Sequence, residues 1–122
     1  MSAANTAFST PTSPRGACPS QSRPIDLVHL ARQTMGDKTL ENEVLMMFAR
    51  NARRALQDMT GADAAGVAMT AHRLRGAASA VGAFGVAKAA EKLEADGADA
   101  AHLAALAACV VEAENFILKL CR

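Results

Sequence analysis

The sequence predicts an all-α protein, an up-down-up-down four-helix bundle with an additional short N-terminal helix. Alanine is abundant and β-branched residues are sparse, and Ala has the best intrinsic helix propensity. Apolar side chains recur at spacings of three and four residues, with no alternating pattern of the β type. Because the connections between these stretches are short, neighbouring helices are expected to run antiparallel.

Residues 1–23 precede the first helical stretch and are rich in Ser, Thr, Pro and Ala. Such a composition cannot bury enough apolar surface to order itself, so we expect a flexible tail. The first acidic residue is Asp26, which gives the tail a loose similarity to an organelle transit peptide. A plain disordered leader is the simpler interpretation, and the helical domain is expected over residues 24–122.

The first two helices are expected over residues 25–35 and 39–59. Pro24 suits the first turn of the shorter helix and Gly36 its stop. Thr39 is the expected cap of the longer helix. The expected apolar stripe of this second helix comprises Leu40, Val44, Phe48, Ala52, Leu56 and Met59.

The third helix is expected over residues 61–81. Thr60 and Asp63 resemble a capping box, and Gly82 is a suitable terminator. The expected core stripe comprises Val67, Ala71, Leu74, Ala78 and Val81.

The fourth helix is expected over residues 84–95, closed by Gly97, and the fifth begins after Asp99 and reaches about residue 120. The expected core stripe of the fifth helix comprises Leu103, Leu106, Val110, Ala113, Ile117 and Leu120. With one stripe on each long helix, the sequence predicts that the bundle closes within a single chain, which favours a monomer.

The third helix carries a histidine that points away from this core. On a wheel of 3.6 residues per turn, His72 lies about 160° from Leu74. Its neighbours within about 60° are Ala65, Ala68, Met69, Arg75, Gly76 and Ser79. Apart from Met69 and Arg75, these residues are small, so another protein can approach the imidazole closely. We therefore expect partner docking on the surface formed by Ala65, Ala68, Met69 and Ser79.

The residue types around His72 suit phosphoryl transfer. A neutral imidazole is a good nucleophile near neutral pH. Gly76, one turn later, costs about 1 kcal/mol relative to Ala in a helix, and the missing Cβ opens space beside the ring. The guanidinium of Arg75 is placed to hydrogen-bond phosphoryl oxygens and offset their charge.

The stretch from His72 to Gly82, HRLRGAASAVG, resembles the signature of histidine-containing phosphotransfer (HPt) domains. In that family the phosphorylated His is followed by any residue, an apolar residue, a basic residue, Gly and small residues. The resemblance covers roughly residues 24–122 and implies that His72 accepts the phosphoryl group. Arg75 takes the position where the family usually has Lys, and Ala77 stands where Ser is common.

The resemblance leaves one position of the site unusual. The family often supplies a Gln from the following helix, which helps to position the imidazole or the phosphoryl group. The matching position here holds Glu94, a poor phosphate partner, and the sequence leaves open whether Glu94, Lys88 or Lys92 assists at the phosphate.

The function implied by the resemblance is that of a phosphorelay carrier in two-component signal transduction. His72 would exchange a phosphoryl group with an aspartate of a response-regulator receiver domain, and a hybrid histidine kinase is the other expected partner. The sequence contains no Walker pattern, so we expect a phosphocarrier without an ATP site and not an enzyme. No cofactor is expected on this chain, because Mg²⁺ would be held by the receiver domain.

Two alternatives remain open from the sequence. One is a helical-bundle interaction module that binds a partner without phosphorylation. The other is a dimerising histidine phosphotransferase whose bundle forms between two chains.

Bulk properties exclude several other classes of protein. Lys plus Arg number 13 and Asp plus Glu 12, so the basic footprint of a nucleic-acid-binding protein is absent. No apolar run approaches the roughly 20 residues of a membrane helix. The three cysteines show no metal spacing, and a reduced, cytoplasmic chain is the simplest expectation.

The remaining polar residues of note are expected to be structural or solvated. His29 and His102 lack a setting like that of His72. Arg50, Arg53 and Arg54 form a basic cluster on the second helix, which we interpret as a solvated surface that could also steer an acidic receiver domain.

Overall fold

The computed structural model describes residues 23–121, so most of the expected tail lies outside the described residues. The described part is helical throughout and contains no strand. Its elements are α2 (Leu27–Thr34), α3 (Lys38–Met59), α4 (Ala64–Val81), α5 (Phe84–Asp96) and α6 (Ala100–Leu120).

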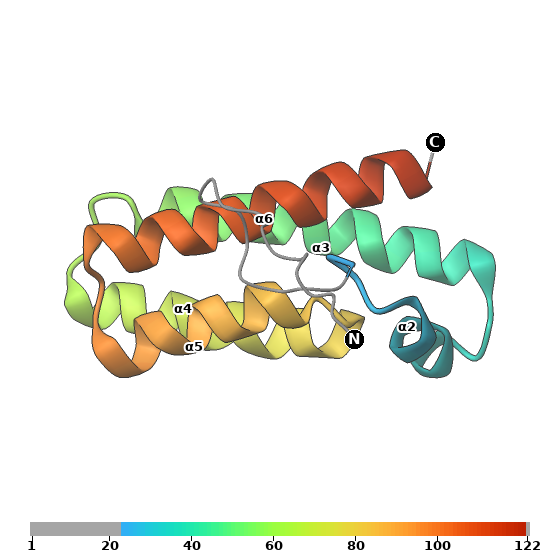
Figure 1. Cartoon of the computed structure of the whole chain (residues 1–122), viewed down its shortest axis with the longest axis horizontal. Coiled ribbons are helices and arrows are strands. Elements are labelled where there is room, and N and C mark those ends of the chain that lie inside the picture. The colour runs from blue at the N-terminus through green and yellow to red at the C-terminus, as the bar shows by residue number, and fades with distance from the viewer. Residues whose placement is uncertain (1–22, 122) are drawn as a thin grey trace, which may run out of the picture.

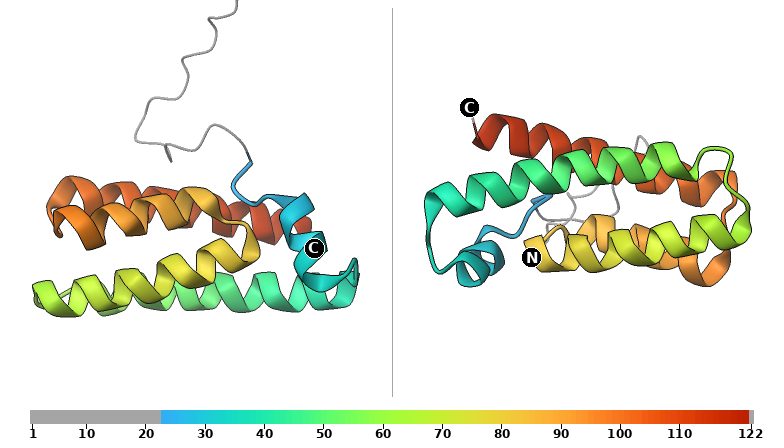
Figure 2. Two further views of the ribbon diagram at one scale, coloured as in Figure 1. Left: turned by 90° about the horizontal axis from the view of Figure 1, so that it is seen from below. Right: turned by 180° about the vertical axis from the view of Figure 1, so that it is seen from behind.

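The four long helices form a bundle in which each helix runs opposite to the one before it (Figure 1). Contacts join α3 to α4, α4 to α5, α5 to α6, and α6 back to α3, so the bundle closes on itself. The short α2 lies at one end, against α3 and α4, as the two further views also show (Figure 2). The groove between α4 and α5 is therefore on the opposite side of the bundle from the groove between α3 and α6.

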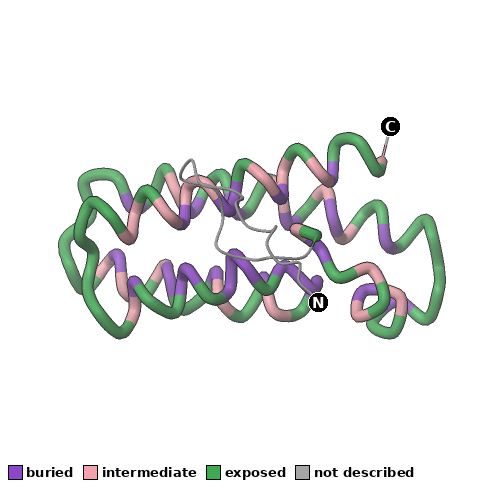
Figure 3. Tube along the Cα trace, viewed as in Figure 1, coloured by how far each residue is buried: buried purple, intermediate pink, exposed green. Residues whose placement is uncertain are grey.

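A continuous apolar core fills the bundle, and buried positions recur along the inner side of every long helix (Figure 3). The predicted core stripe of α4 is confirmed, because all five of its members are buried. Burying each large aliphatic side chain contributes about 1.5–3 kcal/mol. The largest fully buried side chains are Ile25, Leu30, Leu45, Leu93, Leu106, Ile117, Val110 and Cys109.

The first helix begins later than predicted. Asp26 is the N-cap of α2, and its carboxylate accepts hydrogen bonds from the backbone N–H groups of Val28 and His29 at 3.1 and 3.0 Å. Pro24 therefore precedes the helix and does not form its first turn. The side chain of Ile25, outside the helix, is fully buried instead.

Aspartates also cap the next two helices, contrary to the sequence prediction. Asp37, not Thr39, caps α3 by accepting a hydrogen bond from the backbone of Leu40 at 3.0 Å. Asp63 is itself the N-cap of α4, and Thr60 ends α3, so these two residues form no capping box. A carboxylate at the N-cap satisfies a free N–H group and suits the positive end of the helix dipole.

The predicted stripes of α3 and α6 were only partly right. Leu40 is 40% exposed and Leu120 is 43% exposed, so neither belongs to the core. Val44, Leu56 and Leu103 are partly buried and pack against the core from its edge. The buried positions that the prediction missed are Glu41, Leu45 and Ala55 on α3 and Cys109 on α6.

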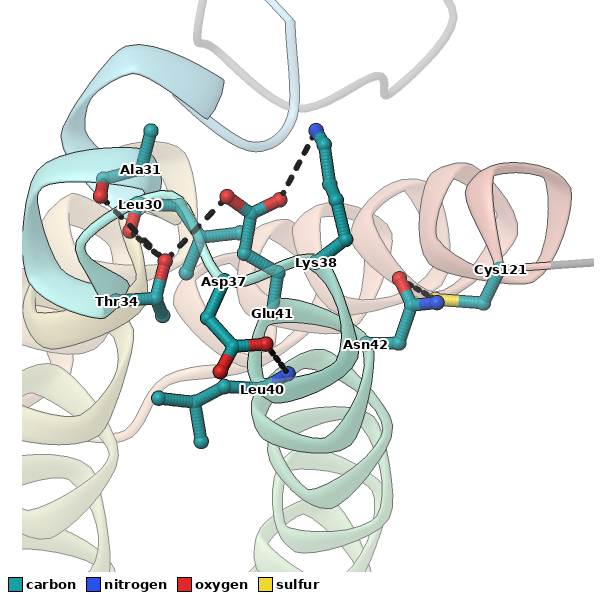
Figure 4. A network of polar contacts seen from close by, with 9 residues as sticks. All are labelled: Leu30, Ala31, Thr34, Asp37, Lys38, Leu40, Glu41, Asn42 and Cys121. Atoms are coloured by element: carbon teal, nitrogen blue, oxygen red, sulfur yellow. Dashed lines mark hydrogen bonds and ion pairs between the residues drawn. The ribbon is translucent and has the colours of Figure 1, made fainter.

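Glu41 is buried because it joins α2 to the first turn of α3 (Figure 4). Its carboxylate accepts a hydrogen bond from the buried hydroxyl of Thr34 at 3.3 Å and pairs with the ammonium of Lys38 at 3.3 Å. The same hydroxyl lies 3.0 Å from the carbonyl oxygen of Leu30, so its single proton is shared between the two acceptors. A buried carboxylate requires such partners, and this network fixes α2 against the end of the bundle.

The turn from α4 to α5 depends on Gly82, which the sequence correctly predicted as the end of the third helix. Gly82 has a φ angle of +87°, and its carbonyl accepts a hydrogen bond from the backbone of Asp26 at 2.9 Å. A Cβ atom at this position would lie 2.8 Å from the carbonyl oxygen of Asp26. Only glycine therefore combines this backbone conformation with this close approach.

We predict that Gly82→Ala lowers the free energy of unfolding by about 1–3 kcal/mol, because it adds both backbone strain and a steric overlap. Gly76→Ala is the matched control, since nothing lies within 4 Å of its added Cβ and its backbone is helical. This second change should raise stability by up to about 1 kcal/mol. Urea denaturation followed by circular dichroism measures both, and equal stabilities of the two variants would contradict this account of the turn.

Candidate functional site

His72 lies in the middle of α4 and points out of the bundle. Its side chain is 62% exposed, whereas Ala71 and Leu74 on the same helix are buried in the core. Packing of the inner side of α4 into the core therefore fixes the rotation of the helix, and this rotation turns His72 toward the outside. The imidazole is accessible to a partner, as the sequence predicted.

One side chain from the neighbouring helix fixes the orientation of the imidazole. The Nδ1 atom of His72 lies 2.5 Å from the Oε2 atom of Glu94 on α5. An ionised carboxylate only accepts hydrogen bonds, so Nδ1 carries the proton and donates it to Glu94. This contact selects the tautomer in which the other nitrogen, Nε2, has a free lone pair.

Arg75 completes a cluster of three charged or ionisable groups. One Nη atom of Arg75 lies 3.5 Å from Oε1 of Glu94, and the other lies 3.4 Å from Nδ1 of His72. Because Nδ1 already donates to Glu94, it has no lone pair for Arg75, and the second distance is a close approach without a hydrogen bond. Arg75 therefore acts on the imidazole through the carboxylate, whose charge it balances.

The carboxylate of Glu94 is not fully satisfied by these contacts. Its Oε1 atom is buried and has no hydrogen-bond partner of good geometry among the described residues, although Arg75 lies within ion-pair distance. If the bond from Nδ1 to Oε2 were lost, neither oxygen of this carboxylate would have a hydrogen bond, which is costly for a largely buried group. The carboxylate of Glu94 has few other hydrogen-bond donors nearby, so it holds the imidazole in place.

The surface predicted for partner docking surrounds His72 on the outer side of α4. Ala65, Met69 and Gly76 are exposed, and Ala68 and Ser79 are partly buried. Met69 is the one large apolar side chain of this set, at 57% exposed. Nothing lies within 4 Å of a Cβ built on Gly76, so the space beside the imidazole is open.

The other histidines have structural surroundings. The ring of His29 packs edge-on against Phe84, with 5.2 Å between the ring centroids. The Nδ1 atom of His102 lies 3.2 Å from the carbonyl oxygen of Gly97 and 3.3 Å from the carboxylate of Asp99. His102 therefore belongs to the turn between α5 and α6.

The free thiol of Cys121 is not an activated nucleophile. Burial raises the pKa of the Cys121 thiol, which makes it a weaker nucleophile. Residues 23–121 contain no group of three or more His, Cys, Asp or Glu side chains arranged to hold a metal ion. In the same range, no helix is long and apolar enough to cross a membrane.

Glu94 is the site residue whose role sequence reasoning missed. The sequence predicted that Glu94 is a poor phosphate partner and left open whether Glu94, Lys88 or Lys92 assists at the phosphate. In the described structure these lysines are exposed and make no hydrogen bond or ion pair. A carboxylate that faces a histidine from the adjacent helix is a familiar means of fixing the ring and its tautomer. The placement of Glu94 on the helix next to His72 was therefore the sequence feature that could have predicted its role.

The chain belongs to the Hpt domain family. The family model matches residues 43–118, which extend from within α3 to within α6 and include the whole of the site. No curated protein and no solved structure matches the chain significantly. Hpt domains are helical bundles that act as phosphocarriers in the phosphorelays of two-component signalling, and the fold and the exposed histidine agree with that class.

We predict that Glu94→Ala changes the preferred tautomer of the His72 imidazole. The neutral ring of the wild-type protein should carry its proton on Nδ1, because Glu94 accepts it there. Without the carboxylate, the Nε2–H form, which free imidazole side chains prefer, should become the major tautomer. Two-dimensional ¹H–¹⁵N spectra of the imidazole nitrogens measure this directly.

Lys92→Ala is the control for this measurement, because Lys92 is an exposed residue of the same helix. It should leave the Nδ1–H tautomer unchanged. The role assigned to Glu94 is wrong if the tautomer of His72 is the same in the Glu94→Ala variant and in the wild type.

Proposed function

We propose that His72 is the phospho-accepting residue of this Hpt domain and that it exchanges phosphoryl groups reversibly with the aspartate of a response-regulator receiver domain. The observation that carries the proposal is the hydrogen bond from Nδ1 of His72 to Glu94. It leaves Nε2 as a nucleophile on an exposed side chain of which 62% is open to solvent. No other histidine of the described chain combines exposure with such a partner.

The transfer step follows from this geometry. The lone pair of Nε2 attacks the phosphorus atom of the aspartyl phosphate and forms a P–N bond. The P–O bond to the aspartyl carboxyl group breaks, and the carboxylate leaves with the electron pair. The Nδ1 proton stays on the ring, which becomes positively charged. Transfer back to an aspartate reverses each of these changes.

Glu94 and Arg75 have distinct roles in this step. Glu94 does not touch the phosphoryl group and is a positioning residue, whose negative charge stabilises the cationic phosphohistidine ring. Arg75 is partly exposed, and its guanidinium lies on the same flank of α4 as His72. It can donate to a phosphoryl oxygen, which would offset charge that develops during transfer. Gly76 keeps the approach to Nε2 open.

The partner supplies what this chain lacks. Phosphoryl transfer depends on positioning and charge neutralisation, and Arg75 provides only part of the charge. We infer that a divalent cation, Mg²⁺, arrives with the receiver domain together with the acceptor aspartate, and that a hybrid histidine kinase is the upstream source. The domain would act as a monomer, because the four long helices of one chain already enclose the core, and we infer a cytoplasmic location together with its receiver partners.

We predict that the wild-type protein becomes labelled when it is incubated with a receiver domain carrying a radiolabelled aspartyl phosphate, and that His72→Gln does not. Gln is polar and of similar size, so the exposed position should tolerate it without unfolding. Equal labelling of both proteins would contradict the assignment. His102→Gln is the control, because it removes a different histidine and should leave labelling intact.

A further inference from the structure

The three arginines that cluster in the sequence of α3 point to different surfaces. Arg53 forms a two-pronged ion pair with Glu114, so its charge is used to join α3 to α6. Arg50 lines the groove between the same two helices. Arg54 also borders that groove, but it extends to the opposite flank of α3, where it lines a separate hollow against α4. Of the three, Arg54 alone reaches the helix that carries His72.

The hollow between α3 and α4 has a volume of about 280 Å³ and contains two arginines. Arg54 comes from α3 and Arg73 from α4, and Asp58 is the only carboxylate among the lining residues. Within residues 23–121, neither Arg54 nor Asp58 forms an ion pair, and the contact of Arg73 is a weak one to the sulfur of Met69 at 3.5 Å. The two guanidinium groups are therefore available to a partner.

This hollow lies on the opposite flank of α4 from Glu94, with the exposed ridge of the helix between the two. His72 and Arg73 are consecutive and point about 100° apart around the helix. The ridge between them carries only Met69 and small residues, and a helix is about 10–12 Å across. A protein that docks over α4 to reach His72 therefore also covers Arg73 and the mouth of the hollow.

The charged side chains of α4 itself are all basic. The helix α4 contains His72, Arg73 and Arg75 but no Asp or Glu. On the α5 flank, Glu94 neutralises Arg75. On the α3 flank, two unpaired arginines face one unpaired aspartate. An excess of positive charge thus remains on the side of α4 that the phosphotransfer chemistry does not use.

We propose that the hollow lined by Arg54 and Arg73 binds an acidic side chain on the surface of the docked receiver domain and so selects among receivers. This inference rests on the proposed function and adds a specificity-determining contact to it. A receiver that presents a carboxylate to the hollow gains charge-assisted hydrogen bonds. A receiver with a basic residue at that place is rejected by repulsion, which is an effective means of discrimination.

The test compares the double variant Arg54→Glu/Arg73→Glu with Arg50→Glu, a charge reversal at an exposed position of α3 that lines only the α3–α6 side. A panel of receiver domains is phosphorylated with acetyl phosphate and Mg²⁺. The second-order rate constant for transfer to each variant is then measured at several ionic strengths.

The rate from receivers that react well with the wild type should fall about tenfold or more in the double variant at low salt, and added salt should narrow the difference. Arg50→Glu should remain within about twofold of the wild type.

A second donor separates docking from chemistry at His72. Phosphoramidate is a small molecule that phosphorylates histidine directly, with release of ammonia, and it needs no docking surface. The double variant and the wild type should react with it at equal rates. Equal slowing with phosphoramidate and with receivers would overturn the docking inference, because the substitutions would then act on His72 itself.

The remaining outcomes distinguish this inference from the proposed function. If receivers label the wild type and the double variant at equal rates, the selective hollow is refuted while the phosphocarrier function stands. If neither receivers nor phosphoramidate label His72, the proposed function itself fails. The neutral variant Arg54→Gln/Arg73→Gln provides a second measurement should charge reversal disturb the fold. It should show a smaller loss of rate, which added salt also narrows.

Discussion

The hydrogen bond between Nδ1 of His72 and the carboxylate of Glu94 is the interaction on which the proposed chemistry of this domain depends. It holds one nitrogen of an otherwise mobile, exposed ring and thereby leaves the other nitrogen free and outward. The bond forms because α4 and α5 pack closely along their length, from the turn at Gly82 onward. The apolar core thus determines the reactivity of a side chain that it does not contain.

The outer side of α4 is divided into three zones with different properties. Toward α5, Glu94 and Arg75 form a nearly neutral pair that orients and supports the imidazole. Along the ridge, small residues and Met69 leave room for another protein. Toward α3, Arg54 and Arg73 leave an excess of positive charge. In the proposed function, the chemistry at His72, the access of the partner and the choice of the partner therefore depend on different residues of the same helix.

The sequence predicted the fold class, the core stripe of α4 and the outward direction of His72, because the 3.6-residue period directly reports which side of a helix is apolar. The starts of the helices were less predictable, since Asp26 and Asp37 cap them in place of the residues expected. Glu41 could not be recognised as buried, because its partner Thr34 lies on a different helix. Contacts between helices depend on rotation and register that one sequence does not specify.

The most direct test of the central claim is to locate the phosphoryl group on the phosphorylated protein by ¹H–¹⁵N and ³¹P spectroscopy. The account predicts coupling between phosphorus and Nε2 of His72, with the Nδ1 proton still present and hydrogen-bonded to Glu94. A phosphoryl group on Nδ1, or on any residue other than His72, would contradict it.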